Sequence, residues 1–429
     1  MSLSINVKNS LLLISEKVIV LGMAFLTSVL LARIAGPEIF GQFSYITSFV
    51  ALFIPLCVMG LNNIATKYFV KYPKHSHHYF LTALTIRGIG ALSCLIIGSL
   101  SAYLIGVTQA QFTYITILLF LQSFTLFYLV EFYFLAKKQV LYTLRIRLTI
   151  ILFFSILKIM IILKGANLLY LIIAHGLEVS FIGISYLLLY FKHKNQLDNQ
   201  INKNISKTNM LGLFSKGKWL LFSGISAVIY LKIDQVMLEY FHGAKEVAYY
   251  AAAAKLSEFW YVFPVLIANA YNPKLIELKH KSAEYYKNFL LRMLSFMVVA
   301  SFIISIVTFS FSPNIINIIY GGDYQSSSSI LNIHIFASLF IFQRAILSKW
   351  LIIEKHYHFS LLSTGIGATV NVALNILLIP LFGGIGAAWA TLLSYMVASF
   401  LSLALTKQTR VFMKLMLEAT LRWPKYIKG

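Results

Sequence analysis

The stretch NSLLLISEKVIVLGMAFLTSVLLAR, residues 9–33, is long and apolar enough to cross a lipid bilayer as one helix, and the turn GPEIFGQF, residues 36–43, follows it. A transmembrane helix needs about 20 mostly apolar residues. Eleven further stretches meet that length: 42–65, 80–104, 112–136, 141–164, 167–191, 219–240, 247–272, 288–312, 328–353, 358–380 and 384–406. The sequence therefore predicts an all-α integral membrane protein with twelve transmembrane helices.

The basic residues predict which ends of these spans face the cytoplasm. The even-numbered connections and the two termini hold 23 Lys and Arg residues, whereas the odd-numbered connections hold one, Lys245. Positive residues stay on the cytoplasmic side of a membrane. We therefore expect both termini to be cytoplasmic and the short odd-numbered connections to face outward. Glu16 and Lys17 interrupt the first span and no small-residue cleavage pattern follows it, so we expect a retained helix and not a signal peptide.

The composition argues against a soluble or nucleic-acid-binding protein. Hydrophobic residues make up 59% of the chain and charged residues 12%, against about 25% charged residues in soluble domains. The net charge of +22 lies mostly beside the spans, where anionic lipid headgroups are found. We expect these basic residues to contact membrane lipids. We expect no nucleic acid as a partner, since no separate domain is present to bind it. Cys57 and Cys94 both fall inside spans and predict no disulfide framework.

The longest polar connection divides the spans into two sets of six. It runs from about Lys192 to Lys218 and has no apolar periodicity before Met210. It predicts an N-terminal bundle, residues 1–205, and a C-terminal bundle with a cytoplasmic tail, residues 206–429.

The two halves carry related sequences. The turn GPEIFGQF at 36–43 recurs 207 positions later as GAKEVAYY at 243–250, with glycine, bulky apolar and aromatic residues at matching offsets. Pro55 in span two and Pro264 in span eight each lie well inside a helix, where proline should kink or break it. Because six is even, both halves enter the membrane from the same side. The two six-helix bundles should therefore be related by a pseudo-two-fold axis along the membrane normal, with a substrate path between them.

Four motifs together resemble the polysaccharide flippases, which are the O-antigen and exopolysaccharide repeat-unit translocases of the multidrug/oligosaccharidyl-lipid/polysaccharide exporter superfamily. The motifs are LARIAGPEIFG at 31–41, IDQVML at 233–238, YGGDY at 320–324, and Asn371, Asn375, Ile379, Pro380 and Gly383 to Ala388 around span eleven. One departure is Ala248, where the usual pattern has glycine; close helix packing survives this change.

The resemblance implies two six-helix bundles in a V that work by alternating access. It implies a substrate as well: an oligosaccharide repeat unit linked to undecaprenyl pyrophosphate, carried from the cytoplasm to the periplasm across a bacterial inner membrane. We expect a monomer, with other polysaccharide-assembly proteins as candidate partners.

Basic residues inside the spans are the candidate substrate-binding groups, because a charge within a bilayer usually faces a bundle interior or a wet cavity. Arg87, Arg145, Arg147 and Arg344 lie within about ten residues, or about 15 Å, of a cytoplasmic end. Guanidinium groups bind pyrophosphate oxygens in a bidentate fork, although long basic side chains near helix ends also reach out to headgroups. Lys158 lies deeper, and we weigh a cavity role against contact with the outer headgroups. Arg145 and Arg147 are two residues apart, so both cannot line one narrow face.

Acidic and histidine side chains deeper in the spans are candidates for coupling or gating. His175 and Glu178 lie three apart on span six and could form a protonatable site or simply an interhelical hydrogen bond. Asp234 on span seven could pair with Lys255 on span eight as a structural ion pair, or it could exchange protons during transport. Glu258 shares a helix face with Lys255.

Other polar residues in the spans favour packing roles. Glu131 could neutralise Arg87 or Arg145, and Asn371 and Asn375 stack four apart on span eleven as candidates for helix contacts or sugar contacts. Several aromatic residues could stack on sugars: Tyr249, Tyr250, Trp260 and Tyr261.

Together these features predict a flippase that moves a lipid-linked oligosaccharide by rocking two bundles around a cationic cavity. A drug or cation antiporter of the same fold is the first alternative, although cationic substrates would require an acidic cavity. A membrane glycan polymerase or ligase is the second, but the largest outer connection, about Pro313 to Ser327, is short for a catalytic site. The sequence has no Walker loop, paired-carboxylate motif or His/Cys metal cluster. We therefore expect no catalytic residue, metal or cofactor, and leave open whether an H⁺ or Na⁺ gradient drives transport.

Overall fold

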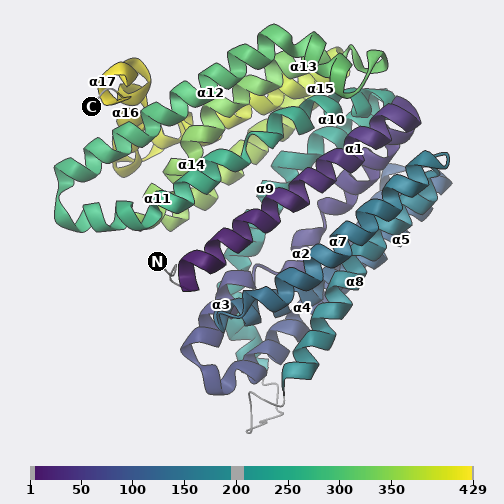
Figure 1. The fold of residues 1–429 in the computed structure, drawn as a ribbon, viewed down its shortest axis with the longest axis horizontal. Coiled ribbons are helices and arrows are strands. Elements are labelled where there is room, and N and C mark those ends of the chain that lie inside the picture. Colours follow the sequence, from purple (N-terminus) through teal and green to yellow (C-terminus); the bar gives the residue numbers. More distant parts are fainter. Residues whose placement is uncertain (1–4, 195–206, 428–429) are drawn as a thin grey trace. The chain divides into compact units, whose positions relative to one another are not determined.

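The computed structural model describes residues 5–194 and 207–427, and helices make up nearly all of them. Ten helical stretches in this part of the chain are long and apolar enough to cross a membrane. The two longest, Ser15–Lys71 and His358–Leu405, each hold two predicted spans joined at a glycine with positive φ, Gly36 or Gly383. The twelve predicted spans are therefore present, and the all-α prediction is confirmed (Figure 1).

The chain forms two compact units, residues 1–232 and 233–429. The first unit holds six spans and the first part of a seventh. Its helices are α1 (Ile5–Ala51), α2 (Ile54–Val58), α3 (Asn62–Lys71), the 3₁₀ turn η1 (Pro73–His75), α4 (Ser76–Ile105), α5 (Gln109–Ser123), the 3₁₀ turn η2 (Phe124–Tyr128), α6 (Leu129–Ala136), α7 (Val140–Leu163), α8 (Leu168–Lys194) and the first part of α9 (Lys207–His242). The predicted domain boundary at residues 205 and 206 lies outside the described residues.

The second unit begins within α9 and holds the remaining spans. Its other helices are α10 (Ala244–Phe259), α11 (Val262–Lys281), α12 (Ala283–Ile319), the 3₁₀ turn η3 (Gly322–Tyr324), α13 (Ser327–His334), the 3₁₀ turn η4 (Ile335–Ala337), α14 (Ser338–Ile353), α15 (Tyr357–Ser399), the 3₁₀ turn η5 (Leu401–Leu405), α16 (Lys407–Leu421) and α17 (Trp423–Ile427). Because α12 continues to Ile319, the connection to α13, which the sequence predicted to face outward, is shorter than expected and covers residues 320–326.

The two turns of the internal repeat have the same backbone conformation. Gly36 has φ 77° and ψ 176°, and Gly243 has φ 82° and ψ −177°. This combination is open almost only to glycine, because a Cβ atom would clash with the backbone. Phe40 and its counterpart Val247 are both fully buried four residues later. The predicted repeat is thus confirmed locally, and its glycines let one transmembrane helix reverse into the next.

Both predicted proline breaks occur, in spans two and eight. Span two is interrupted between α1 and α2 directly before Pro55, and span eight is interrupted between α10 and α11 shortly before Pro264. Spans four and ten are interrupted as well, by the 3₁₀ turns η2 and η4, and this was not predicted. A break in the helical hydrogen-bond ladder leaves backbone carbonyls free to accept side-chain donors within the membrane.

Each unit has its own hydrophobic core. In the first, α1 packs on α7, α7 on α8 and α4 on α5, around residues such as Leu129, Phe134 and Tyr186. In the second, α12 packs on both α14 and α16. The C-terminal segment, predicted only as a tail, therefore contains an ordered helix, with Phe412 and Met416 almost fully buried in the core.

Candidate functional site: polar clusters within the spans

Arg87 lies on α4 and is completely buried. Its guanidinium donates one hydrogen bond to the Leu126 carbonyl in η2 at 3.0 Å and another to the side-chain oxygen of Asn62 at the start of α3. Leu126 lies in the 3₁₀ turn that interrupts span four, and Asn62 directly follows a second break in span two, at residues 59–61 between α2 and α3. Arg87 thus joins three spans in the packed interior of the first unit. Its predicted contact with a substrate phosphate stays a prediction.

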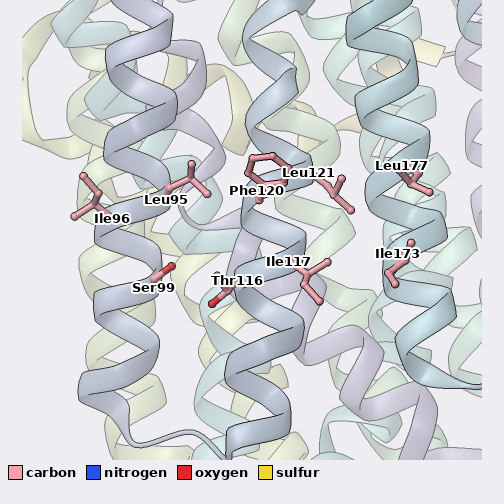
Figure 2. Close-up of a pocket in the computed structure, with 9 residues that line it drawn as sticks. All are labelled: Leu95, Ile96, Ser99, Thr116, Ile117, Phe120, Leu121, Ile173 and Leu177. Carbon is pink, nitrogen blue, oxygen red and sulfur yellow. The ribbon is translucent and has the colours of Figure 1, made fainter.

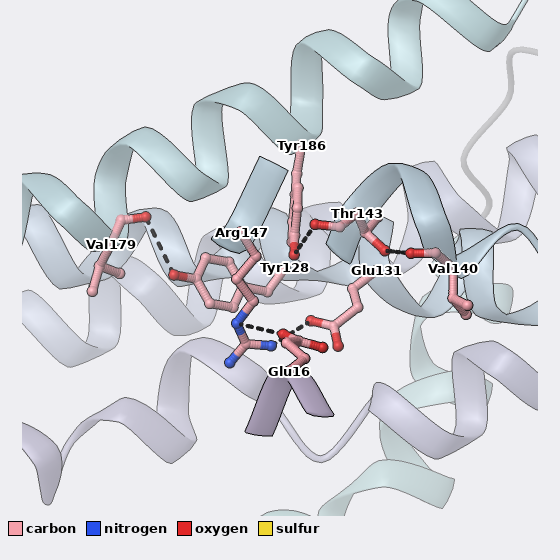
Figure 3. Close-up of polar contacts among 8 residues, drawn as sticks. All are labelled: Glu16, Tyr128, Glu131, Val140, Thr143, Arg147, Val179 and Tyr186. Carbon is pink, nitrogen blue, oxygen red and sulfur yellow. Dashed lines mark hydrogen bonds and ion pairs between the residues drawn. The ribbon is translucent and has the colours of Figure 1, made fainter. Parts of the chain in front are cut away.

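A second cluster joins spans one, four and five (Figure 3). The Arg147 guanidinium lies 3.3 Å from a carboxylate oxygen of Glu16 and 3.3 Å from one of Glu131. The Glu16 side chain is 7% exposed, while those of Arg147 and Glu131 are about 30% exposed. Two carboxylates therefore share one cation, so the cluster has a net negative charge when both are ionised. Tyr128 and Tyr186 flank it and donate to backbone carbonyls of α8 and α7, respectively.

This cluster corrects one expectation and supports another. The sequence suggested Arg87 or Arg145 as the partner of Glu131, but the structure places Arg147 there. Arg145 is exposed on the surface of the first unit, whereas Arg147 is half-buried. The prediction that these two arginines point to different faces of α7 is confirmed. Their predicted role in substrate binding remains a prediction, and Arg145 keeps its guanidinium available for it.

A buried ion pair links spans five and six. The Lys158 ammonium lies 2.6 Å from a carboxylate oxygen of Glu178, and the two side chains are 12% and 14% exposed. Lys158 therefore points into the unit and not to the outer headgroups. The sequence had grouped Glu178 with His175 on the same helix, but the His175 ring contacts Phe43 of α1 at 5.9 Å. A role for either residue in coupling stays a prediction.

The second unit contains a buried carboxylate surrounded by neutral hydrogen-bond donors. Asp234, which is 2% exposed, accepts hydrogen bonds from the Tyr250 hydroxyl at 2.5 Å, the Thr391 hydroxyl at 2.9 Å and the Asn375 amide at 2.5 Å. Asn375 also donates to Asn371 at 3.1 Å. These side chains come from α9, α10 and both halves of α15. They bring four spans together at one acidic group.

The predicted Asp234–Lys255 ion pair is wrong. The partners of Asp234 among the described residues are hydroxyls and an amide, and the nearest donor on α10 is Tyr250. Lys255 follows Tyr250 by five residues, which places it about 140° away around the helix. Lys255 and Glu258 are both half-buried, and their predicted part in gating stays untested. Asn371 and Asn375 are fully buried and serve as interhelical contacts, as the packing interpretation expected.

Arg344 joins spans ten, eleven and twelve. It is half-buried on α14 and donates to the Ala398 carbonyl at 2.8 Å and to the Thr364 hydroxyl at 2.8 Å. A longer hydrogen bond of 3.3 Å reaches the Ser363 hydroxyl. Like Arg87, it uses a carbonyl and side-chain oxygens as neutral partners, so its charge is not cancelled by a carboxylate in these contacts. A contact with substrate phosphate stays a prediction for Arg344.

The sequence identified the charged residues but missed several of their partners. Glu16 was noted only as an interruption of the first span, although a carboxylate inside a membrane helix is itself a signal of a buried site. Tyr250 was considered only for sugar stacking, and Asn62 and Thr391 gave no signal beyond a polar residue within a span. No group of three or more His, Cys, Asp or Glu residues suited to a metal occurs in the described part of the chain.

A groove on the first unit is lined almost entirely by apolar side chains (Figure 2). It has a volume of about 740 Å³ and lies on α4, α5 and α8. Ile117, Phe120 and Leu177 are among its lining residues, and Ser99 and Thr116 are the two polar ones. It contains no charged group for a phosphate or an ion. Its lining therefore differs from the charged and polar clusters described above.

Sequence comparison matches the chain to a family of polysaccharide biosynthesis proteins. The family model described as "Polysaccharide biosynthesis protein" matches residues 6–279, and the model described as "MatE" matches residues 220–377. The probable low-salt glycan biosynthesis flippase Agl15 of Haloferax volcanii is 25% identical over 203 residues, which cover 46% of this chain and 42% of that protein. The chain thus spans about two fifths of the length of the curated relatives it matches.

Solved structures confirm the fold across almost the whole chain. The lipid II flippase MurJ in an inward closed conformation matches with a TM-score of 0.70 and 16% identity, covering 97% of this chain and 91% of that one. An inward-facing multidrug resistance transporter of the MATE family, of the MOP superfamily, matches with a TM-score of 0.61 and 14% identity, covering 95% and 96%. At these identities the likeness concerns architecture alone.

Proposed function

Because the chain belongs to the polysaccharide biosynthesis protein family, we propose that it is a flippase for an oligosaccharide repeat unit linked to undecaprenyl pyrophosphate. Alternating access would carry this substrate from the cytoplasmic to the periplasmic leaflet of a bacterial inner membrane. We place both termini in the cytoplasm and propose that the protein acts as a monomer, with other polysaccharide-assembly proteins as candidate partners.

The observation that supports this substrate class is the set of guanidinium groups within the spans. Arg145 is exposed, and Arg344 is half-buried in the second unit, where it donates to the Ala398 carbonyl and the Thr364 hydroxyl. Both lie near the Lys- and Arg-rich ends of their spans. A guanidinium keeps its charge in an apolar medium and matches phosphate oxygens in two hydrogen bonds. A pyrophosphate whose polyprenyl tail stays in the lipid reaches this depth.

The Asp234 cluster is the proposed site of coupling to H⁺ or Na⁺. A carboxylate buried among neutral donors lacks a compensating charge, so binding a proton or a small cation would relieve its desolvation. Oxygen ligands suited to a hard cation are close: the carboxylate, the Thr391 hydroxyl and the buried Asn375 side-chain oxygen, which has no hydrogen-bond partner among the described residues. The cluster links four spans, so a change in its charge would act on their packing.

A drug or cation antiporter is the second candidate, and the MatE match over residues 220–377 favours it. The two functions differ in what accumulates when the protein is absent. For a flippase, deletion of the gene in a host that carries it should abolish the surface glycan. Lipid-linked repeat units should accumulate in the inner leaflet, where periodate added outside spheroplasts cannot oxidise them. Complementation with the wild-type gene should restore both. Normal glycan together with increased drug sensitivity would favour the antiporter.

A further inference from the structure

The C-terminal helix α16 has one face in the core of the second unit. Phe412, Leu415, Met416 and Ala419 recur at helical spacing and are all buried. These residues pack against α12, and α17 also packs against α12 (Figure 1). Figure 1 shows α16 and α17, in yellow, near the end of the unit where α11 turns into α12. This is an end at which basic residues are concentrated in the sequence.

The opposite face of α16 and the start of α17 combine large apolar and basic side chains. Leu421 is 78% exposed, Val411 55%, and Leu417 and Trp423 42% each. The exposed basic residues among them are Lys407, Arg410, Lys414, Arg422 and Lys425. A helix surface that is both strongly apolar and basic is typical of a helix lying in the interface of a membrane, where the apolar groups enter the lipid and the basic groups meet headgroups.

A cavity of about 540 Å³ lies between α16 and the ends of α11, α12 and α14. Trp350, Leu290 and Leu415 form part of its apolar wall, while Lys287 and Lys414 are among its polar residues. The apolar wall suits the acyl chains of a phospholipid, which lie in the membrane. The lysines suit its phosphate, which lies at the membrane surface.

Of the three lysines that line the cavity, two lie beside carboxylates and the third is available to bind an anionic ligand. Lys279 is held by both oxygens of Glu354 at 2.7 Å, and Lys287 lies 4.0 Å from Glu418. Glu418 also accepts a hydrogen bond from the Tyr426 hydroxyl. Lys414 is exposed and has no ion-pair partner in the described part of the chain. The three lysines that line the cavity outnumber its two carboxylates.

We propose that this cavity binds the headgroup of an anionic phospholipid. Lys414 and Lys287 contact the phosphate, and the acyl chains follow Val411 and Leu415 into the bilayer. The site would anchor α16 to the leaflet beside it and so hold the end of the second unit at the membrane surface. The inference is independent of what the protein transports, because it rests on contacts of the second unit alone.

The test uses the delipidated full-length chain in detergent and native mass spectrometry. Dioleoylphosphatidylglycerol should be retained more strongly than dioleoylphosphatidylcholine. In the Lys287→Gln/Lys414→Gln variant its affinity should fall about twenty-five-fold, since each lysine near an anionic surface contributes about fivefold. Both lysines are exposed, so the variant should keep its thermal midpoint. The Lys287→Arg/Lys414→Arg variant should bind like the wild type.

The matched control is Lys67→Gln/Lys281→Gln, which removes two exposed lysines outside the cavity, one within α3 and one at the end of α11. It should bind phosphatidylglycerol like the wild type. Equal retention of the two lipids, or an unchanged affinity in the Lys287/Lys414 variant, would overturn the proposal. Full displacement of the lipid by inorganic phosphate at the same concentration would do so too, because the cavity would then recognise free phosphate.

Discussion

Arg87 and Arg145 are both arginines near the basic ends of spans, and they differ in what surrounds them. Arg87 has no exposed surface and holds the helix breaks of spans two and four together. Arg145 is exposed on α7. Substitution of Arg87 should therefore mainly reduce the stability of the protein, and substitution of Arg145 should mainly reduce transport.

We expect Arg87→Ala to destabilise the protein by about 3 kcal/mol, because hydrogen bonds to a charged group are lost and a buried carbonyl and amide are left without a donor. Arg87→Lys should recover only part of this, since one ammonium cannot reproduce the two directions of the fork. Arg145→Ala should leave stability unchanged and reduce glycan export. Thermal midpoints in detergent and surface glycan measure the two effects. A stable Arg87→Ala variant would contradict the structural role.

Asp234 offers a second test at this scale. Asp234→Asn keeps the shape of the side chain but removes its charge, so the protein should accumulate near the normal level and lose most transport if the carboxylate binds the coupling ion. Asp323→Asn, an exposed position on the outer turn before α13, is the matched control and should transport normally. Lys255→Ala should not rescue Asp234→Ala, because Asp234 is bonded to Tyr250, Thr391 and Asn375 instead. Rescue would restore the ion-pair interpretation.

The sequence revealed the charged residues of the spans but not their partners. A charge in an apolar stretch is visible without any structure, because its insertion is costly. The partners of Asp234 on α15 lie 141 and 157 residues away in the chain, so only tertiary packing identifies them. The same holds for Glu16 and Arg147, which belong to spans one and five.

At the scale of elements, glycine and proline gave the strongest predictions. The matching conformations of Gly36 and Gly243 and the breaks beside Pro55 and Pro264 were expected from the repeat. The ordered helix α16 was missed because its apolar residues occupy one face only and do not form a continuous hydrophobic stretch. The 3₁₀ turns in spans four and ten were missed because no proline or glycine marks them.

The glycine turns lead to a stability prediction. Gly36→Ala and Gly243→Ala should each cost about 1–3 kcal/mol, because alanine is strained at this backbone conformation. No atom of a non-adjacent residue lies within 4 Å of the added Cβ at either site, so the cost would come from the local backbone conformation and not from contact with a packed neighbour. Gly22→Ala within α1 meets no atom within 4 Å either and should be neutral or slightly stabilising. Equal thermal midpoints for all three variants would argue against strained turns.

At the scale of the whole molecule, the hydropathy pattern was sufficient to predict twelve spans, and the structure contains them in two compact units. The orientation in the membrane rests on the distribution of Lys and Arg. The substrate path between the bundles remains a prediction, because side-chain patterns identify charged positions within spans but not the surface they face during transport.

Orientation can be tested by labelling single cysteines in intact cells. Cysteine at Gln325, exposed beside η3, should react with a membrane-impermeant maleimide, whereas cysteine at Lys74, exposed in η1, should react only after the cells are opened. The native Cys57 and Cys94 are buried and should contribute little background. Labelling of both positions from outside would overturn the assigned topology.

The most direct test of lipid-linked oligosaccharide transport is reconstitution of the purified chain in proteoliposomes that contain an undecaprenyl-pyrophosphate-linked oligosaccharide in both leaflets. An impermeant glycosidase is added outside, and the fraction of the glycolipid cleaved over time is measured with and without an imposed H⁺ or Na⁺ gradient. We predict that cleavage stops at about half in protein-free vesicles and proceeds toward completion with the wild-type chain, more slowly with Arg145→Ala. Cleavage that stops at the same fraction with and without the protein, under every gradient, would contradict a flippase function.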